Sequence, residues 1–220
     1  MSPALRFVLL AAAVVALALL SLTIGPRSDV GLGNIVQLLL VDDGSLARST
    51  VVDLRLPRML IAALIGTNLG LAGLALQAIT RNGLASESVL GINQGAALGV
   101  AIGLVAPGLV VVDLHVMAIL GAVVAGLVTF GIAGGLGGRL DSMRLILAGV
   151  TVGAFSFAFV RFTFTLEDNL ARAMLSWTAA DISAARFDQA GPLLLWALGG
   201  LAASMAMAHS FNILALGDGA

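Results

Sequence analysis

The stretch that decides the fold is "MLIAALIGTNLGLAGLALQA", Met59–Ala78, which contains no charged residue. A helix of about 20 apolar residues is as long as the hydrocarbon core of a bilayer is thick, about 30 Å. The segment "RLPR", Arg55–Arg58, directly precedes it, so two arginines flank a proline at the edge of this run. The sequence therefore predicts a transmembrane helix with two fixed cations at its lip.

The composition extends this prediction to the whole chain. Of its 220 residues 60% are hydrophobic and 10% are charged, and the mean hydropathy is +1.08, whereas soluble domains carry about 25% charge. The apolar runs are continuous rather than alternating, which favours helices over a barrel. We expect an all-α, polytopic transmembrane protein that forms a single domain over residues 1–220. The six expected spans are Leu5–Ile24, Pro57–Ala78, Gln94–Val112, Leu114–Gly135, Leu145–Phe164 and Ala190–Ala208.

Several kinds of chemistry are excluded by the residues that the chain lacks. Without cysteine it has no disulfide and no thiol catalyst, and without lysine it has no phosphate-binding loop of the G-x-x-x-x-G-K-[ST] type. The two histidines are far apart and have no metal-binding spacing. The net charge of -1 gives no reason to expect nucleic acid as a partner. We therefore predict no catalytic residue, metal or cofactor.

The polar and small residues inside the spans are few and informative. No expected span contains an acidic residue, which argues against a proton-coupled carrier and requires another source of energy. Gly66, Gly70 and Gly73 recur at helical spacing, so a neighbouring helix is expected to approach the second span closely. Arg161, near the end of the fifth span, either lines a pathway or extends to the membrane surface.

Four stretches resemble one family of membrane proteins. They are "LRLPRMLIAALIGTNLGLAGLALQAITRNGLASESVLGINQGAALG" (Leu54–Gly99), "SMRLILAGVTVG" (Ser142–Gly153), "LSWTAADIS" (Leu175–Ser183) and "FNILALGDGA" (Phe211–Ala220). In this order they resemble the permease subunits of ABC importers for iron-siderophores, haem and cobalamin, the FecCD type. One departure is "RNGLASE", residues 81–87, where the family has two prolines.

The resemblance implies a topology and a set of partners. Family members have ten spans and lie in the bacterial plasma membrane with both termini in the cytoplasm. Two permease subunits, identical or different, assemble on ATPase subunits that hydrolyse ATP, so this chain is not expected to be an enzyme. A soluble binding protein delivers the substrate from outside. Because the sequence stops at Ala220, four spans short of the family, we expect a C-terminally truncated permease.

The resemblance also implies three sets of site residues. Arg55 and Arg58 are expected to dock acidic residues of the binding protein, with both guanidiniums pointing outward because residues three apart share a helix face; anchoring to lipid headgroups is the alternative. Ser142 and Met143 are expected at a cytoplasmic gate, or else in a simple turn. The ATPase-coupling element, otherwise an ordinary polar tail, comprises Ala215, Leu216, Gly217, Asp218, Gly219 and Ala220.

The predicted function is that of the transmembrane permease subunit of an ATP-driven importer for iron-siderophore complexes. Within the same family, the alternatives are cobalamin and haem, because no residue in this chain distinguishes one chelate from another. A self-contained carrier or channel would need polar residues that converge at mid-depth, and Asn68 is the main candidate for such a residue. A non-transporting membrane scaffold is the third possibility.

Overall fold

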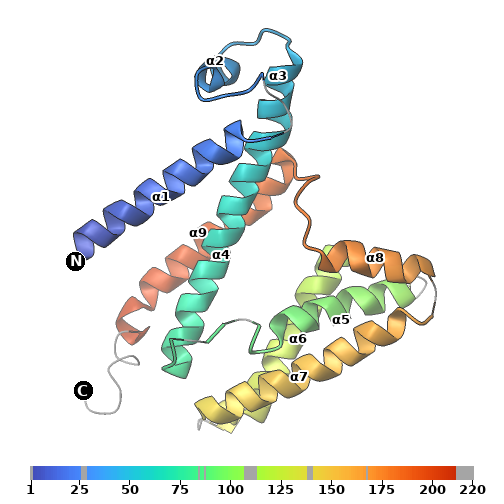
Figure 1. Cartoon of the computed structure of the whole chain (residues 1–220). Helices are drawn as coiled ribbons and strands as arrows, with labels where there is room; N and C mark the ends of the chain where they lie inside the picture. Colours follow the sequence, from blue (N-terminus) through green and yellow to red (C-terminus); the bar gives the residue numbers. More distant parts are fainter. Residues whose placement is uncertain are drawn as a thin grey trace. The chain divides into compact units, whose positions relative to one another are not determined.

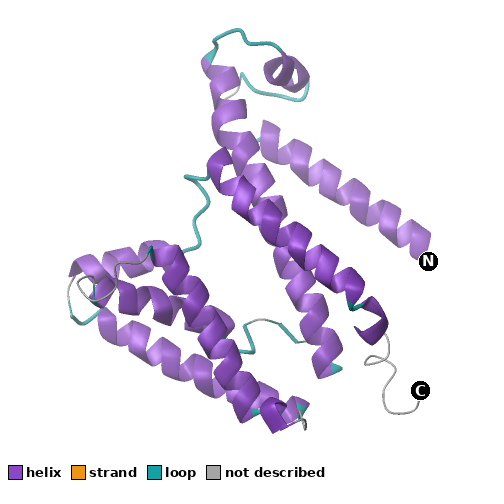
Figure 2. Ribbon diagram, turned by 180° about the vertical axis from the view of Figure 1, so that it is seen from behind, coloured by secondary structure: helices purple, strands orange, loops and turns teal. Residues whose placement is uncertain are grey.

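Helices make up the regular structure of the chain. The structure is a computed structural model that describes residues 2–25, 29–83, 85–86, 88–106, 113–137, 141–166 and 168–211. Among these residues there is no β-strand. The predicted all-α fold class is therefore confirmed, and the ribbon diagrams show only helices and their connections (Figures 1 and 2).

The helices vary from single turns to long apolar rods. The α-helices are α1 (Pro3–Thr23), α2 (Ile35–Leu40), α3 (Leu46–Ser49), α4 (Leu56–Thr80), α5 (Ile92–Val105), α6 (Leu114–Ile132), α7 (Ser142–Thr163), α8 (Asp168–Thr178) and α9 (Ala190–Ala206). A π-helical segment, Thr50–Arg55, joins α3 to α4, and short 3-10 turns occur at Gly135–Gly137 and Phe187–Gln189.

Within the described residues, five helical segments are long and apolar enough to cross a membrane. They are Pro3–Thr23, Leu46–Thr80, Leu114–Ile132, Ser142–Thr163 and Phe187–Ala206. The third expected span, Gln94–Val112, differs from the prediction. Its helix, α5, has 14 residues, about 21 Å at 1.5 Å per residue, and residues 107–112 lie outside the described part.

Side-chain caps explain where three of the long helices begin. Ser2 accepts a hydrogen bond from the Leu5 N–H, and Pro3 occupies the first position of α1, where its missing N–H costs nothing. The carboxylate of Asp113 accepts from the His115 N–H at the start of α6, and that of Asp141 accepts from the Arg144 N–H at the start of α7. Each cap satisfies a backbone donor that the helix leaves open.

The chain divides into two compact units, which are described separately. The first comprises Met1–Asn68 and Ile182–Gly199. Its core packs the end of α1 against α2, α3 and the π-helical segment, through Leu22, Val30, Ile35, Leu38, Ala47 and Val51. Asn68 adds a polar tie, because its side-chain amide donates to the carbonyl of Leu193 in α9 at 3.3 Å. The single domain predicted over residues 1–220 stays a prediction.

The second unit comprises Leu69–Asp181 and Gly200–Ala220. It is built around α5, which packs against α6, α7 and α8. Met174 of α8 is fully buried and joins Val100, Ala101 and Val160 in its main core. A second cluster packs Leu90, Ala133 and Leu145 together. In Figure 1, α5, α6 and α7 form a bundle with α8 beside α5.

Large apolar side chains cover the outward faces of the long helices. Phe7 on α1, Leu127 on α6 and Phe155 on α7 are more than 60% exposed, together with many similar residues. Soluble monomers rarely expose apolar patches on this scale. These faces suit contact with lipid tails.

Candidate functional site

The structure assigns the two arginines of the lip different environments. Arg55 ends the π-helical segment and is 7% exposed. Its Nη1 donates to the carbonyls of Leu22 and Thr23 in the last turn of α1, at 2.8 Å and 2.9 Å. The expectation that both guanidiniums point outward is therefore wrong for Arg55, because the open carbonyls of α1 are its partners. The docking role itself stays a prediction.

Arg58 is the more accessible of the two cations. It lies in the first turn of α4, is half-buried, and follows the fully buried Pro57. Its Nε has no hydrogen-bond partner among the described residues. This Nε atom is itself buried, so a carboxylate or a phosphate can approach only the part of the half-buried side chain that stays exposed.

Two carboxylates, Asp42 and Asp43, lie just before α3 and interact with Arg48 and Ser45. Asp42 forms an ion pair with Arg48 at 3.2 Å. The backbone N–H of Ser45 donates to Asp43, and this bond together with the Ser45 hydroxyl lowers the pKa of the Asp43 carboxyl. Asp43 therefore stays ionised at neutral pH, so this segment carries both signs of charge.

The predicted gate residues begin α7. Ser142 is half-buried and the Met143 side chain is 65% exposed. Just before them, the Asp141 N–H donates to the carbonyl of Ala133 at 3.4 Å, which holds the start of α7 beside the end of α6. Met143 is thus an accessible, flexible side chain at a helix end, as a gate residue or an ordinary turn residue would be. The predicted coupling residues, Ala215 to Ala220, lie outside the described residues.

The closest helix packing uses a glycine series that the sequence prediction missed. Gly91, Gly95, Gly99 and Gly103 recur every four residues from the N-cap of α5 onward. A Cβ added at Gly99 would overlap the carbonyl oxygen of Met117 in α6, and one at Gly95 would overlap Ala125. Gly91 has φ +70°, and an added Cβ would lie 2.7 Å from the Gly149 carbonyl oxygen of α7. In the sequence, the four-residue spacing of these glycines was the signal that could have indicated this packing.

The glycines singled out from the sequence behave differently. A Cβ built at Gly66, Gly70 or Gly73 of α4 meets nothing within 4 Å in the described part of the chain. Among the described residues, the expected close approach to α4 at these glycines is absent.

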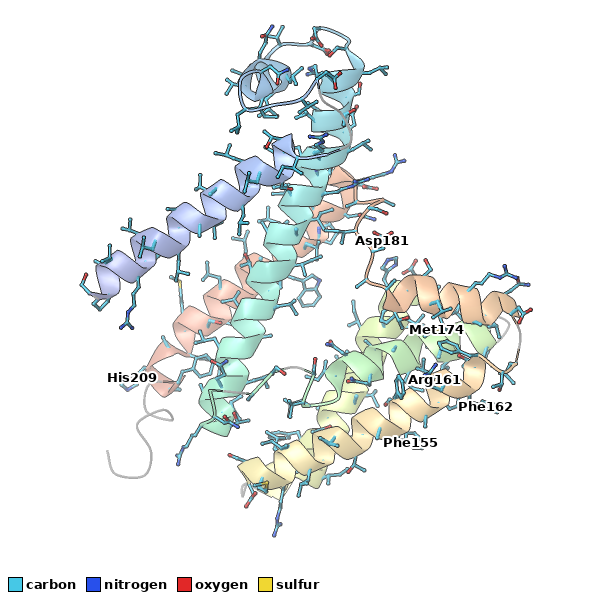
Figure 3. The ribbon with its side chains drawn as sticks, viewed as in Figure 1. Phe155, Arg161, Phe162, Met174, Asp181 and His209 are labelled. Atoms are coloured by element: carbon cyan, nitrogen blue, oxygen red, sulfur yellow. The ribbon has the colours of Figure 1, made fainter. Side chains whose placement is uncertain are left out.

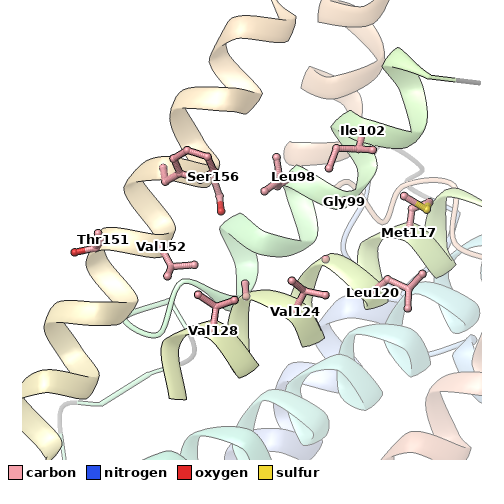
Figure 4. Close-up of a pocket in the computed structure, with 13 residues that line it drawn as sticks. Leu98, Gly99, Ile102, Met117, Leu120, Val124, Val128, Thr151, Val152 and Ser156 are labelled. Carbon is pink, nitrogen blue, oxygen red and sulfur yellow. The ribbon is translucent and has the colours of Figure 1, made fainter. Parts of the chain in front are cut away.

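An apolar cavity of about 530 Å³ lies between α5, α6 and α7 (Figure 4). Its lining is almost entirely aliphatic or aromatic, and Thr151 and Ser156 supply the hydroxyl groups. The size falls within the range of small-molecule sites. However, no charged side chain lines it, so it offers nothing to hold a charged metal chelate.

Arg161 lies near the C-terminal end of α7 (Figure 3). Its guanidinium carbon is 5.4 Å from the ring centroid of Phe157 and 5.8 Å from that of Phe164. Such distances allow cation–π attraction. The side chain is exposed, so both readings of Arg161, pathway and membrane surface, stay open predictions.

The described residues define a class of protein. They form long apolar helices, with two arginines before one of them and glycine-mediated packing of α5 on α6. Within them no group of three or more metal-ligating side chains comes together. A helical membrane protein fits these features.

Comparison with known proteins identifies the family. The model of the FecCD transport family matches residues 13–220. The chain therefore belongs to the FecCD transport family and is a multi-pass membrane protein.

Three relatives illustrate the similarity. The Fe(3+) dicitrate transport system permease protein FecC of Escherichia coli (strain K12) is 36% identical over 176 residues, 79% of this chain and 53% of that protein. The Fe(3+)-citrate import system permease protein YfmD of Bacillus subtilis (strain 168) is 30% identical over 90% of this chain and 59% of its own length. The iron-uptake system permease protein FeuC of the same organism is 33% identical over 88% and 60%. The chain thus spans slightly more than half the length of these relatives.

A solved structure supports the fold. It is assigned to the metal-chelate type of ABC transporter, in an inward-facing conformation. It matches 98% of this chain and 65% of its own chain with a TM-score of 0.72. The sequence identity is 22%, so this likeness supports the arrangement of helices alone.

Proposed function

We propose that the chain is the transmembrane permease subunit of an ATP-driven importer for ferric chelates. The observation that carries the proposal is the family match over residues 13–220, together with relatives named for ferric citrate and iron uptake. The residue content agrees with it. Without lysine the chain has no phosphate-binding loop of the Walker type, so a separate ATPase subunit supplies the energy.

In the proposed importer, several parts of the chain have separate roles. It lies in a bacterial plasma membrane with both termini in the cytoplasm. A soluble binding protein docks at the lip through Arg58, with Arg55 behind it, and Ser142 and Met143 form the inner gate. Residues 215–220 couple the permease to the ATPase. A second permease subunit, identical or different, completes the pathway between the two copies.

Two other functions remain as alternatives. The chain is 37% identical over 144 residues to the vitamin B12 import system permease protein BtuC of Vibrio vulnificus (strain CMCP6), which favours a cobalamin or haem permease as second candidate. A non-transporting membrane scaffold is the third candidate.

Growth on a ferric chelate tests the proposal. Bacteria that lack their own ferric-dicitrate permease but keep its ATPase and binding protein should grow with ferric dicitrate as the sole iron source when they carry the permease to which this chain belongs. Growth on a ferric hydroxamate alone would show that the substrate is a different ferric chelate. Insertion of the chain without growth on any ferric chelate would contradict the proposal.

Reporter fusions test the predicted topology and the short helix α5 together. The segment between Ser45 and Asp218 contains α4, α5, α6, α7 and α9. If α5 crosses the membrane despite its 14 residues, fusions after Ser45 and after Asp218 report opposite sides, with Ser45 outside. Fusions that report the same side would show that α5 does not cross, and a cytoplasmic Ser45 would reverse the orientation.

If Met143 is a gate residue, the transport rate should depend on the size of the side chain at position 143. Met143→Trp should slow transport about tenfold or more, because a bulky, stiff side chain cannot move aside as methionine does. Met143→Leu, which keeps the volume, is the matched control and should transport normally. Uptake rates at equal protein levels measure this. Unchanged transport and unchanged basal ATP hydrolysis in Met143→Trp would remove the residue from the gate.

A further inference from the structure

Among the described residues, the segment that follows α1 caps its C-terminal end only in part. Its last turn contains no basic residue, and its C-cap, Ile24, is extended rather than a left-handed glycine. The Ile24 N–H and the Thr23 hydroxyl satisfy the carbonyls of Leu20 and Leu19. The carbonyls of Leu22 and Thr23 still need donors, because a helix leaves its last four carbonyls open. Near lipid, an unsatisfied carbonyl is costly.

Arg55 supplies these donors from another helix. Its Nη1 donates to both carbonyls, 32 and 33 residues away in sequence. The contact also places a positive charge at the negative end of the α1 dipole, which stabilises the helix end. Leu22 belongs to the same core cluster as Val51, one turn before Arg55. The hydrogen bonds and the apolar contacts therefore join the same two segments.

Residue 25 must be small for this arrangement to exist. A Cβ built on Gly25 would overlap Nη2 of Arg55 and would lie 2.9 Å from its Cζ. The guanidinium could avoid an alanine there only by moving, and moving it would break the two hydrogen bonds to α1. Gly25 has no positive φ, so alanine is acceptable to its backbone. Among the described residues, the three atoms nearest to such a Cβ all belong to Arg55.

We propose that Arg55 is a positioning residue that clamps the end of α1 to the π-helical entrance of α4, with Gly25 as the space in which its guanidinium lies. This clamp leaves Arg58 as the accessible cation of the "RLPR" segment. The proposal concerns the chain itself and holds whichever substrate the chain carries.

A double-mutant cycle tests the clamp. In a chain that is otherwise unchanged, Gly25→Ala should lower the midpoint of thermal unfolding in detergent by about 3–6 °C. In the Arg55→Met background the same substitution should have no effect, because the flexible methionine has no hydrogen bonds to lose. Gly33→Ala is the matched control, since a Cβ there meets nothing within 4 Å, and it should change neither background. Equal losses from Gly25→Ala in both backgrounds, or no loss in either, would overturn the proposal.

A local probe separates the clamp from a general loss of stability. The chain has no cysteine, so a single spin label can be attached through Ile24→Cys, at a side chain that is 70% exposed. The label should become more mobile in Arg55→Met and should keep its mobility in Arg58→Met. An unchanged label in Arg55→Met would show that Arg55 does not hold the end of α1.

Discussion

Replacing Gly99 by leucine is expected to lower the midpoint of thermal unfolding by about 6–12 °C, since overpacking costs about 3 kcal/mol. The added side chain would meet the backbone of Met117 and Gly121 in α6, and backbone cannot turn aside as a side chain can. The helices α5 and α6, which form the most extensive helix pair, would have to separate. Unfolding followed by circular dichroism in detergent measures the change.

Gly70→Leu is the matched control for this prediction. It makes the same substitution within a long apolar helix, α4, where an added Cβ meets nothing within 4 Å in the described part of the chain. Both variants gain the same intrinsic helix propensity. Gly70→Leu should therefore leave the midpoint unchanged or raise it slightly. If the two variants lose stability equally, close packing of α5 on α6 is not what stabilises the second unit.

Reversing the charge of Arg58 is expected to weaken docking of the soluble binding protein by about 10- to 100-fold. Arg58 is half-buried, so part of its side chain is accessible, and a bidentate contact with a carboxylate is the interaction that arginine makes best. Arg58→Glu would place like charges together. Binding to the chain in nanodiscs, measured at two salt concentrations, should show that the natural contact weakens with salt.

Arg172→Glu provides the control for this charge reversal. It makes the same change at an exposed arginine of α8, which the predicted topology places on the same side. Docking by this variant should fall by less than about threefold. Charge-reversed carboxylates on the binding protein should restore part of the affinity lost in Arg58→Glu. Unchanged docking by a correctly inserted Arg58→Glu chain would leave only anchoring to lipid headgroups as its role.

The sequence was sufficient for the fold class because hydrophobic length is a local property. Twenty apolar residues identify a span without any knowledge of its neighbours, and four of the six predicted spans agree with long helices to within a few residues. The second span is longer than predicted because the helix starts earlier, at Leu46. The third is shorter, since α5 ends at Val105 although apolar residues continue as far as Val112.

The environments of single residues could not be predicted in the same way, because they depend on contacts between distant segments. In the sequence, Arg55 and Arg58 look equivalent. In the structure, Arg55 is buried and donates a hydrogen bond to the end of α1, about thirty residues away. Likewise, Gly66, Gly70 and Gly73 have a packing motif but meet no neighbour within 4 Å in the described part of the chain, whereas Gly95 and Gly99 have both the motif and a close neighbour. Spacing indicates that a helix can be approached closely, but it does not show which helix approaches.

The central claim, that the chain forms the pathway of an ATP-driven ferric-chelate importer, is tested most directly by reconstituted transport. Proteoliposomes that contain the chain, an ATPase subunit of this family and its binding protein are loaded with ATP, and the uptake of radiolabelled ferric dicitrate is measured beside that of cobalamin. We expect uptake of ferric dicitrate that requires both ATP and the binding protein. Uptake of cobalamin alone, or no uptake of either by an assembled complex that hydrolyses ATP, would contradict the central claim.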